Sequence, residues 1–397
     1  MNDASLGIIG DGQLARMLGE AARKMGLNVT VFAEDAAHPA ARIALPTVLG
    51  SPKSLDALRQ FVSKMDIIVF ENEFVDCDLL TRASSGAKVT FLPSLANIAL
   101  FQDKLKQKEK LKELSIPTSS FMAWDEKEDP TLWVNAAFDQ LGSCVFKWSR
   151  LGYDGKGVFI ARDRASDLTA ILGFITEARK KGVQIYAEQK IDFRRELAIV
   201  STLSTLGEFV SYPLVISKQE NGICRQVLGP ATSFGVPTHL QELATQYAHR
   251  LGTSCGLFGT FAIELFETAD GDLLVNEIAP RVHNSGHYTQ DAAETSQFEN
   301  HWRGVLGLPL GPAKTSPAFF MWNVLGPDDT GPVKDSPEAR PKALAPLRLH
   351  WYEKEEIRPR RKLGHINASA ASPDEIDKLI NEILRVDREW VLSLKTL

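Results

Sequence analysis

Two acidic residues in the second half of the chain offer the clearest chemistry in the sequence. Asp270-Gly271 is a favoured dipeptide for a two-residue hairpin turn. Pairing outward from this turn sets Phe266 opposite Val275. It also sets Glu264 opposite Glu277, and directly opposed like charges, with Cβ atoms about 5 Å apart, destabilise a sheet unless something lies between them. The spacing therefore predicts a bound divalent cation, with two solvated glutamates or a register slip of one residue as the alternative.

The neighbouring residues favour a hard cation. Asn276 and Glu267 lie close to the acidic pair, and the hairpin contains neither cysteine nor histidine. Oxygen ligands suit Mg²⁺ or Mn²⁺ better than zinc. The polar run at 276–287 follows directly, and its density is typical of a site rather than a core. His283 and His287 have the i, i+4 spacing of a zinc helix, but the residues between them favour a loop, so a zinc hydrolase is disfavoured.

A glycine-rich loop precedes the hairpin in the chain: Gly152-Tyr153-Asp154-Gly155-Lys156-Gly157. Its glycines leave backbone N–H groups free to wrap an anion, and Lys147 and Lys156 add positive charge. The loop resembles a phosphate lid, but it lacks the GxxxxGK[ST] order of a Walker-type ATPase. A glycine-rich turn without a ligand is the alternative.

A second glycine turn, Gly10 to Ala15, follows a strand and opens a helix. This GxGxxA context binds phosphate at a helix N-terminus in dinucleotide enzymes, with Glu34-Asp35 further along the chain. Alone it would suggest a nicotinamide-dependent oxidoreductase. The same turn also serves simply to pack a helix on a strand.

Composition limits the classes of function. The chain has 397 residues, enough for two to three domains, and a net charge of −5, which argues against a general nucleic-acid binder. A small basic cluster, His350–Lys354 with Arg358–Lys362 and His365, is suited to one phosphorylated metabolite. The four cysteines form no CxxC pair, which favours reduced thiols in a cytoplasmic protein. We find neither an apolar run of roughly 20 residues nor a secretion signal, so no membrane association is expected.

The elements that must position these residues begin with a doubly wound α/β unit. Its expected strands are apolar throughout, as parallel strands covered on both faces tend to be: residues 6–9, 29–32, 66–70 and 89–92. Apolar residues at helical spacing predict a helix from Leu14 to Met25, capped by Gly26. Ser94 to Leu114 is expected to form one lysine-rich helix.

The remaining elements follow an α+β pattern. The expected strands, with a helix at 167–180 among them, are residues 145–147, 158–160, 185–188 and 197–200. A helix at 240–251 leads into the hairpin at 260–278. A strand-like run at 318–325 joins a third, smaller unit, which ends in a helix with the capping box Ser372 and Glu375.

Taken together, these features resemble the ATP-grasp superfamily and, within it, the 5-(carboxyamino)imidazole ribonucleotide synthetase family of purine biosynthesis. The matching motifs run along nearly the whole chain: GDGQLARML from Gly10, ENEFV from Glu71, FQDKLKQK from Phe101, GYDGKG from Gly152, NEIAPRVHNSGHYT from Asn276, SQFENHWR from Ser296 and RPRRKLGH from Arg358. The resemblance implies a Rossmann-like pre-ATP-grasp domain at 1–103, an ATP-grasp domain at 104–315 with a lid-bearing lobe at about 118–190, and a small C-terminal domain at 316–397.

The resemblance also implies ligand contacts, carried over by motif position. Those expected to bind ATP are Lys104, Lys147, Gly152, Tyr153, Gly155, Lys156, Gly157, Glu188, Ile191, Glu196 and Asn276. Glu264 and Glu277 would hold Mg²⁺, with Mn²⁺ possible, in agreement with the hairpin argument. Those expected at the bicarbonate and its activated form are Arg281, His283 and Asn284, with Asp154 on the lid orienting the amine or the bicarbonate. Those expected at the ribonucleotide are Gln13, Glu73, Lys354 and Arg361.

The implied reaction is the ATP-dependent carboxylation of aminoimidazole ribonucleotide with bicarbonate, through carboxyphosphate. The resemblance also implies a homodimer. Three rivals stay open: a sister ligase with another acceptor amine, the nicotinamide oxidoreductase, and a nucleotide sensor without catalysis. The sequence departs from the family pattern at Ala15, Leu151 and Arg360. Because Arg360 occupies a usual glycine position, either it or Arg361 would hold the substrate phosphate.

Overall fold

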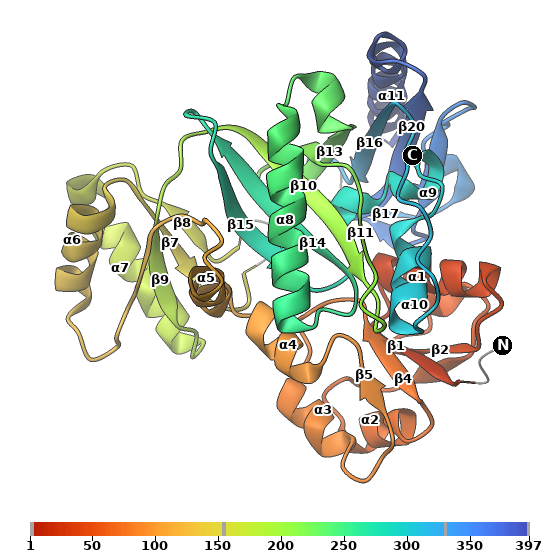
Figure 1. Cartoon of the computed structure of the whole chain (residues 1–397), viewed down its shortest axis with the longest axis horizontal. Coiled ribbons are helices and arrows are strands. Elements are labelled where there is room, and N and C mark those ends of the chain that lie inside the picture. Colours follow the sequence, from red (N-terminus) through yellow and green to blue (C-terminus); the bar gives the residue numbers. More distant parts are fainter. Residues whose placement is uncertain (1–3, 153–155, 329–331, 395–397) are drawn as a thin grey trace.

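The N-terminal strands form one parallel sheet, red to orange in Figure 1. The structure is a computed structural model that describes residues 4–152, 156–328 and 332–394. The strands of this sheet, in the order β3-β2-β1-β4-β5, are β1 (Leu6–Ile9), β2 (Val29–Ala33), β3 (Thr47–Leu49), β4 (Ile67–Phe70) and β5 (Thr90–Phe91). Strand β3 was not predicted, because it has only three residues and none of them is buried.

Helices cover both faces of this sheet, which confirms the doubly wound prediction. Helix α1 (Gln13–Lys24) packs with Leu6 and Ile8 in one apolar cluster. Helices α2 (Leu55–Val62) and α3 (Cys77–Ala83) contribute to a second cluster that contains Ile9. Gly26 follows α1 with a φ of +67°, the left-handed conformation expected of the predicted cap.

The single helix predicted from Ser94 to Leu114 is wrong. The segment forms α4 (Leu95–Phe101) and α5 (Lys104–Glu113), separated by Gln102 and Asp103. Asp103 has an extended backbone, and its carboxylate accepts hydrogen bonds from the N–H groups of Leu105 and Lys106, so it is the N-cap of a new helix. The break sets Lys104 at the start of α5, where the amide donates to the Ser149 carbonyl at 2.7 Å.

A small lobe follows, at the left of Figure 1. Its antiparallel strands, in the order β6-β9-β7-β8, are β6 (Phe121–Ala123), β7 (Cys144–Trp148), β8 (Val158–Ile160) and β9 (Ile185–Gln189). Helices α6 (Pro130–Leu141) and α7 (Arg164–Lys180) share one apolar core with these strands. The glycine-rich loop therefore connects two neighbouring strands, as expected of a hairpin lid.

The second sheet has nine strands and continues into the C-terminal part of the chain. In the order β15-β14-β10-β12-β13-β16-β20-β18, with β11 beside β10, they are β10 (Phe193–Leu203), β11 (Phe209–Ser211), β12 (Val215–Glu220), β13 (Ile223–Gly229), β14 (Gly259–Thr268), β15 (Leu273–Ala279), β16 (Ala318–Leu325), β18 (Arg348–Trp351) and β20 (Lys362–Ala370). Helix α8 (Thr238–Cys255) lies over β10 and β14 (Figure 1). The C-terminal unit thus extends the sheet through the pairing of β13 with β16.

Of the remaining helices, α11 (Pro373–Leu394) and α9 (Thr289–Ala292) pack against the C-terminal strand β20, and α10 (Gln297–Val305) links the large sheet to the N-terminal domain. Strand β17 (Val333–Lys334) pairs with β19 (Glu356–Ile357). Trp302 on α10 donates to the carbonyl of Leu18 on α1 at 2.9 Å. The Ser372 hydroxyl caps α11 as predicted, accepting from the Glu375 amide. Among the described residues, no helix combines the length and apolar character needed to cross a membrane.

The β14–β15 hairpin contains two departures from the predicted register that cancel. The turn has three residues, because the Thr268 amide pairs with the Asp272 carbonyl at 2.9 Å. Phe266 consequently faces Leu274, and the predicted pair with Val275 is wrong. Asn276 then forms a β-bulge that restores the count and turns the next side chain to the other face. The predicted pairing of Glu264 with Glu277 is confirmed.

Candidate active site

Three carboxylates lie on one face of the large sheet. Side chains alternate along a strand, so Glu196 on β10 shares its face with Ala198, which is opposite Glu264 on β14. Glu264 is opposite Glu277 on β15. The intervening Leu265 points to the other face, into the apolar core under α8. The acids therefore gather on the face away from α8.

Lys104 brings a positive charge to this face from the start of α5. Its Nζ lies 2.6 Å from Glu277 Oε2. Burial favours the neutral form of Glu277, but the charge and hydrogen bond of Lys104, with the charges of Lys147 and Arg281, together outweigh burial and lower the pKa of Glu277. For Glu264, burial and the charge of Glu277 together raise the pKa to about 7. One carboxylate is thus compensated by the chain, and the other is short of positive charge.

The donor set of this pair fits a hard divalent cation. The two carboxylates supply only oxygen, and the raised pKa of Glu264 reports unbalanced negative charge at the same place. In residues 4–152, 156–328 and 332–394, no group of three or more His, Cys, Asp and Glu side chains could hold a metal ion. Mg²⁺ would therefore need further oxygen ligands from a bound phosphate or water, which is its usual manner of binding.

A second cluster of charge surrounds Glu188 on β9. Its carboxylate contacts the ammonium group of Lys147 on β7 and lies 3.0 Å from Lys108 Nζ on α5. Burial opposes ionisation, but the two ammonium groups outweigh it and lower the pKa of Glu188 to about 2. Lys108 was not predicted from the sequence to have a role, although its i, i+4 spacing from Lys104 places both on one face of a helix. Lys108 also donates to the Ser119 hydroxyl at 2.9 Å.

The segment after β15 carries the predicted bicarbonate residues. The Arg281 guanidinium forms a two-pronged ion pair with Glu73 from the N-terminal domain, at 2.5 and 3.2 Å. Because Glu73 is only 6% exposed, this pair fixes the orientation of Arg281. Two residues predicted to bind different substrates are therefore in direct contact, more than two hundred positions apart in the sequence.

His283 faces the acidic pair. Its Nε2 lies 3.7 Å from Glu264 Oε1, and its Nδ1 lies 2.9 Å from the Ser285 hydroxyl. Burial, with the positive charge of Arg281 and Lys362, lowers the pKa of His283 to about 3. The imidazole is therefore neutral at physiological pH, and it is able to exchange hydrogen bonds but not to supply positive charge.

The side chains of Asn284 and His287 contact other polar groups. The Asn284 amide exchanges two hydrogen bonds with the amide of Asn323 on β16, at 2.6 and 3.1 Å. His287 is fully buried, with its ring 4.8 Å from the ring of His365. The rings of His283 and His287 have different partners, and among the described residues no group of three or more His, Cys, Asp and Glu side chains supports the zinc alternative.

Part of the glycine-rich loop can be placed. Gly152 lies beside the Lys104 side chain, since a Cβ there would be 3.9 Å from Lys104 Cε. Gly157 has a φ of +70° and packs against the ring of Trp148. Lys156 is exposed, and Ile191 is half-buried between β9 and β10. The predicted lid residues Tyr153, Asp154 and Gly155 lie outside the described residues.

In the N-terminal glycine turn, a carboxyl group of the chain itself accepts from the first amides of α1, which argues against a phosphate or dinucleotide at these amides. The Glu71 carboxylate accepts hydrogen bonds from the amides of Gly12, at 2.7 Å, and Leu14, at 3.2 Å. A Cβ at Gly10 or Gly12 would overlap Glu71. The glycines therefore admit a buried side chain of the same chain, and Gln13, which begins α1, is half-buried beside this turn.

The residues of the C-terminal basic cluster differ in their exposure and in their partners. Arg360 is exposed and pairs with Asp328 at 2.9 Å. Arg361 is half-buried and donates to the Glu356 carbonyl at 3.1 Å. Lys354 Nζ lies 5.8 Å from the centre of the Tyr352 ring. Of the two arginines left open by the sequence, the geometry favours Arg361 for a ligand, while its role stays a prediction.

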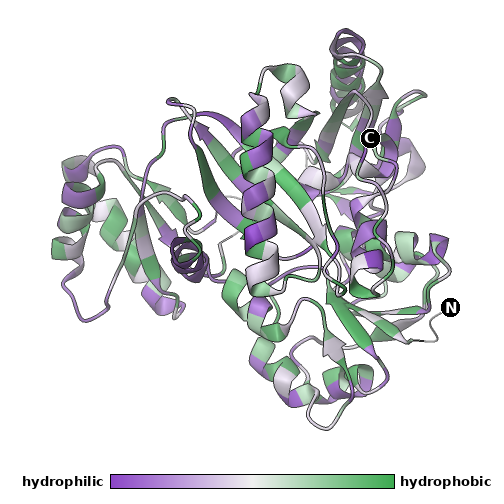
Figure 2. Cartoon of the chain, in the orientation of Figure 1, coloured by the Kyte–Doolittle hydropathy of each residue, from purple (hydrophilic) through white to green (hydrophobic). Residues whose placement is uncertain are grey.

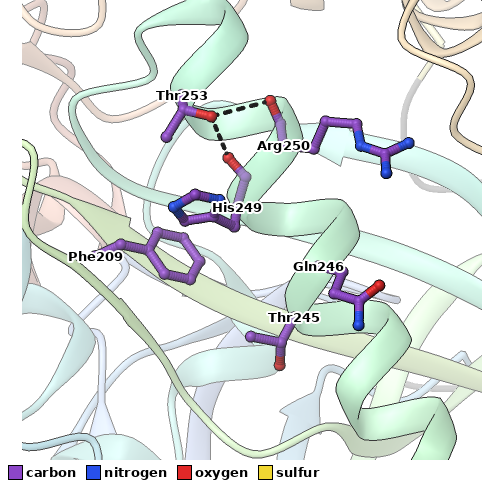
Figure 3. Close-up of a pocket in the computed structure, with 6 residues that line it drawn as sticks. All are labelled: Phe209, Thr245, Gln246, His249, Arg250 and Thr253. Carbon is purple, nitrogen blue, oxygen red and sulfur yellow. Dashed lines mark hydrogen bonds between the residues drawn. The ribbon is translucent and has the colours of Figure 1, made fainter.

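A surface hollow of about 590 Å³ lies elsewhere (Figure 3). It is lined mainly by α8, with the His249 ring set edge-on against Phe209 of β11. Helix α8 covers the face of the sheet opposite the carboxylates. The hollow is therefore separate from the candidate site.

Comparison with sequence families matches three consecutive segments. Residues 3–102 match the ribonucleotide synthetase preATP-grasp domain, residues 109–298 the ATP-grasp domain, and residues 320–379 the phosphoribosylaminoimidazole carboxylase C-terminal domain. Together with facing glutamates on a hairpin and lysines on the neighbouring lobe, these matches define an ATP-grasp protein.

Individual relatives indicate which family of ATP-grasp proteins the chain belongs to. The chain is 38% identical to N5-carboxyaminoimidazole ribonucleotide synthase of Mycobacterium leprae, over 92% of this chain and 84% of that one. It is 36% identical to the synthase of Synechococcus elongatus, over 97% and 95%. The carboxyaminoimidazole ribonucleotide synthase of Aspergillus clavatus complexed with ATP superposes with a TM-score of 0.84 at 30% identity, over 97% and 98%. The chain belongs to the N5-carboxyaminoimidazole ribonucleotide synthase family.

Proposed function

We propose that the chain is an ATP-dependent ligase that carboxylates 5-aminoimidazole ribonucleotide with bicarbonate to give N5-carboxyaminoimidazole ribonucleotide, ADP and phosphate. The observation that carries the proposal is the Glu264–Glu277 pair with Lys104 at one side and the Arg281–Glu73 pair beyond it. A related Aspergillus clavatus structure, with a TM-score of 0.83, is described as a complex with ADP and 5-aminoimidazole ribonucleotide. ATP and aminoimidazole ribonucleotide are therefore the ligands that we assign to this face.

The reaction requires an anion to approach an anion. A bicarbonate oxygen forms a bond to the γ-phosphorus of ATP as the bond to the β-phosphate oxygen breaks, which releases ADP and leaves carboxyphosphate. The substrate amine then takes the carboxyl carbon, phosphate leaves, and the amine nitrogen loses a proton. Lys104, Lys147 and Arg281 would spread the charge of the transferring phosphoryl group, which is the main electrostatic demand of such a step.

Mg²⁺, with Mn²⁺ as a substitute, would be held by Glu264 and Glu277 and would neutralise phosphate charge. Lys104 meanwhile keeps Glu277 ionised, and neutral His283 offers a hydrogen-bonding partner beside the same carboxylates. Glu73 keeps the Arg281 guanidinium in one orientation, and the N–H groups that donate neither to Glu73 nor to the Val282 carbonyl would be available to a carbonate-like anion. Lys354 and Arg361 would hold the ribonucleotide phosphate.

The assembly and location that the family resemblance implies, a homodimer in the cytoplasm, are part of the proposal. Light scattering on the purified chain would test the dimer: a mass near twice the 43.8 kDa of one chain is expected. A single-chain mass at working concentration would contradict it.

The decisive assay measures ADP release at fixed bicarbonate, with and without aminoimidazole ribonucleotide. We expect release to rise with the ribonucleotide and the carboxylated nucleotide to accumulate in equal amount. Stimulation by a different amine would identify a sister ligase. Tight ATP binding without ADP release under any of these conditions would contradict the proposal and indicate a nucleotide sensor.

A further inference from the structure

The SQFENHWR segment, residues 296–303, has no role in the reaction described so far, yet it contacts the segment that bears His283. It forms the start of α10, where the Ser296 hydroxyl caps the helix by accepting from the Glu299 amide. Gln297 is the first residue of that helix, and its side chain is fully buried. A buried primary amide in this position must find partners for both its donor and its acceptor.

The backbone N–H and C=O of His283 are two of these partners, and Gln297 Nε2 also lies 3.4 Å from Nδ1 of the buried His287. The His283 amide donates to Gln297 Oε1 at 2.9 Å, and Gln297 Nε2 donates to the His283 carbonyl at 2.7 Å. One side chain therefore satisfies the complete backbone of one site residue, as a neighbouring strand would do. Among the described residues, no strand pairs with the loop that follows β15 at His283, and η3 (Asn284–Gly286) begins directly after this residue.

The same glutamine is itself held on two sides. The backbone N–H of Gln297 donates to the Thr289 hydroxyl at 3.0 Å, and the backbone carbonyl of Gln297 accepts from the Thr260 hydroxyl at 3.0 Å. Thr260 is on β14, the strand that carries Glu264. The loop also approaches closely, since a Cβ at Gly286 would lie 2.7 Å from Gln297 Cδ. Gln297 thus joins the strand of the acidic pair to the loop of the neutral histidine.

We propose that Gln297 is a positioning residue, which sets the distance and orientation of His283 relative to Glu264 and so the site at which bicarbonate reacts. The proposal rests on the proposed function, because that function is what gives His283 an anion to meet. Gln297 does not touch the substrate, and its effect passes through the backbone of His283.

The chain contains a matched control on the same helix. Asn300 is also fully buried, and it clamps one residue in the same two-way manner: the Gly311 amide donates to Asn300 Oδ1 at 2.8 Å, and Asn300 Nδ2 donates to the Gly311 carbonyl at 3.1 Å. Gly311 belongs to a loop without predicted site residues. Gln297→Met and Asn300→Leu each remove one such clamp while keeping a similar volume.

The experiment measures kcat and KM for bicarbonate and for ATP, together with the melting temperature, in wild type and both variants. We expect Gln297→Met to lower kcat/KM for bicarbonate by about 10²-fold, since small misplacement of a reacting group has effects of that size. KM for ATP should stay unchanged. Asn300→Leu should lose a similar amount of melting temperature and keep its kinetic constants. Unchanged bicarbonate kinetics in Gln297→Met, or equal kinetic loss in Asn300→Leu, would overturn the proposal.

A further variant and an NMR measurement complete the test. Gln297→Glu retains the acceptor for the His283 amide but sets a carboxylate against the His283 carbonyl, so it should show the same kinetic defect if Gln297→Met does not fold. Nitrogen-15 NMR of labelled histidines reports the His283 ring directly, and its Nδ1 signal should change in either Gln297 variant and not in Asn300→Leu. Wild type that fails to release ADP would count against the proposed function, whereas an unmoved His283 signal would count against the role of Gln297.

Discussion

The glycine turn at α1 and the hairpin of β14 and β15 both carry sequence signals for binding phosphate or metal. The carboxylates at the two places have different partners. At the turn, Glu71 supplies the anion that the first amides of the helix require. At the hairpin, Glu264 and Glu277 face each other, and Lys104 contacts the second of them. The first place provides backbone N–H donors for one carboxylate, although burial still raises the pKa of Glu71, whereas the second sets two carboxylates against each other.

This difference separates a structural use of a motif from a functional one. Glycines at 10 and 12 show that something approaches the backbone closely, but the group that approaches comes from a residue 59 positions away. At the hairpin, burial and the facing carboxylate of Glu277 together raise the pKa of Glu264 to about 7, whereas at the turn burial also raises the pKa of Glu71 but backbone N–H groups oppose that rise. Perturbed pKa values of this kind are typical of sites rather than of cores.

The sharpest test of the comparison is to neutralise the hairpin. Glu277→Gln should lower the rate of ADP release by roughly 10²–10³-fold, because one metal ligand and the partner of Lys104 are lost together. Its melting temperature should change little, since removing one of two facing carboxylates also relieves repulsion. Steady-state ADP release with saturating substrates measures the effect. Full activity in a Glu264→Gln, Glu277→Gln double variant would refute the assignment of this site.

The opposite result is expected at the turn. Glu71→Ala leaves the amides of Gly12 and Leu14 without their acceptor, which should cost about 2 kcal/mol of unfolding free energy. The turnover of the folded enzyme should remain close to wild type. Urea unfolding and ADP release, measured on the same preparation, test both statements. Glu71→Gln is the control, since it restores one acceptor and should recover part of the stability; a large loss of turnover with normal stability would instead make the turn a functional site.

The same distinction applies to the C-terminal arginines. Arg360 is paired with Asp328 at the surface, whereas Arg361 is half-buried with a carbonyl partner. Arg361→Gln should raise KM for the ribonucleotide about tenfold, as expected on losing one charged hydrogen bond, and Arg360→Gln should leave it unchanged. KM for ATP is the internal reference. A larger effect at Arg360 would reverse the assignment.

The smallest expected effect is the release of protons when MgATP binds. Because the folded-state pKa of Glu264 is raised from 4.5 to about 7, its contribution to stability is fully present below pH 4.5 and is lost as the pH rises through about 7. A cation bound there favours the ionised form, so binding of MgATP at pH 6.5 should release a fraction of a proton. Calorimetry in buffers of different ionisation enthalpy measures this fraction. Glu264→Gln should abolish it, and an unchanged release would assign the proton elsewhere.

Much of the fold followed from periodicity and local signals. The apolar runs of the parallel strands, the helix from Gln13 to Lys24 and the hairpin strands were all recognisable, because each is specified by residues close in sequence. The helix expected from Ser94 to Leu114 was divided by Asp103, whose capping role competes with an otherwise helical pattern. The domain boundaries near 103 and 315 remain a proposal, which limited proteolysis would test.

Only part of the candidate site could be predicted from the sequence. The facing glutamates were predicted from a two-residue turn, and they face each other because a three-residue turn and the bulge at Asn276 compensate. The pairs of Arg281 with Glu73 and of Lys108 with Glu188 join different elements, so no local sequence pattern predicts them. Gln297 stood in a recognised motif, but its partner is known only once α10 is packed against the loop of His283.

The sequence by itself determined the family, the order of the elements and the kinds of side chain available for phosphate and metal, because these depend on residue type and short-range spacing. Tertiary structure decided which charges are left unbalanced. Whether a carboxylate becomes an internal cap, like Glu71, or a candidate ligand, like Glu264, depends on the groups that the fold brings within hydrogen-bonding distance, and burial then amplifies the consequence of each pairing.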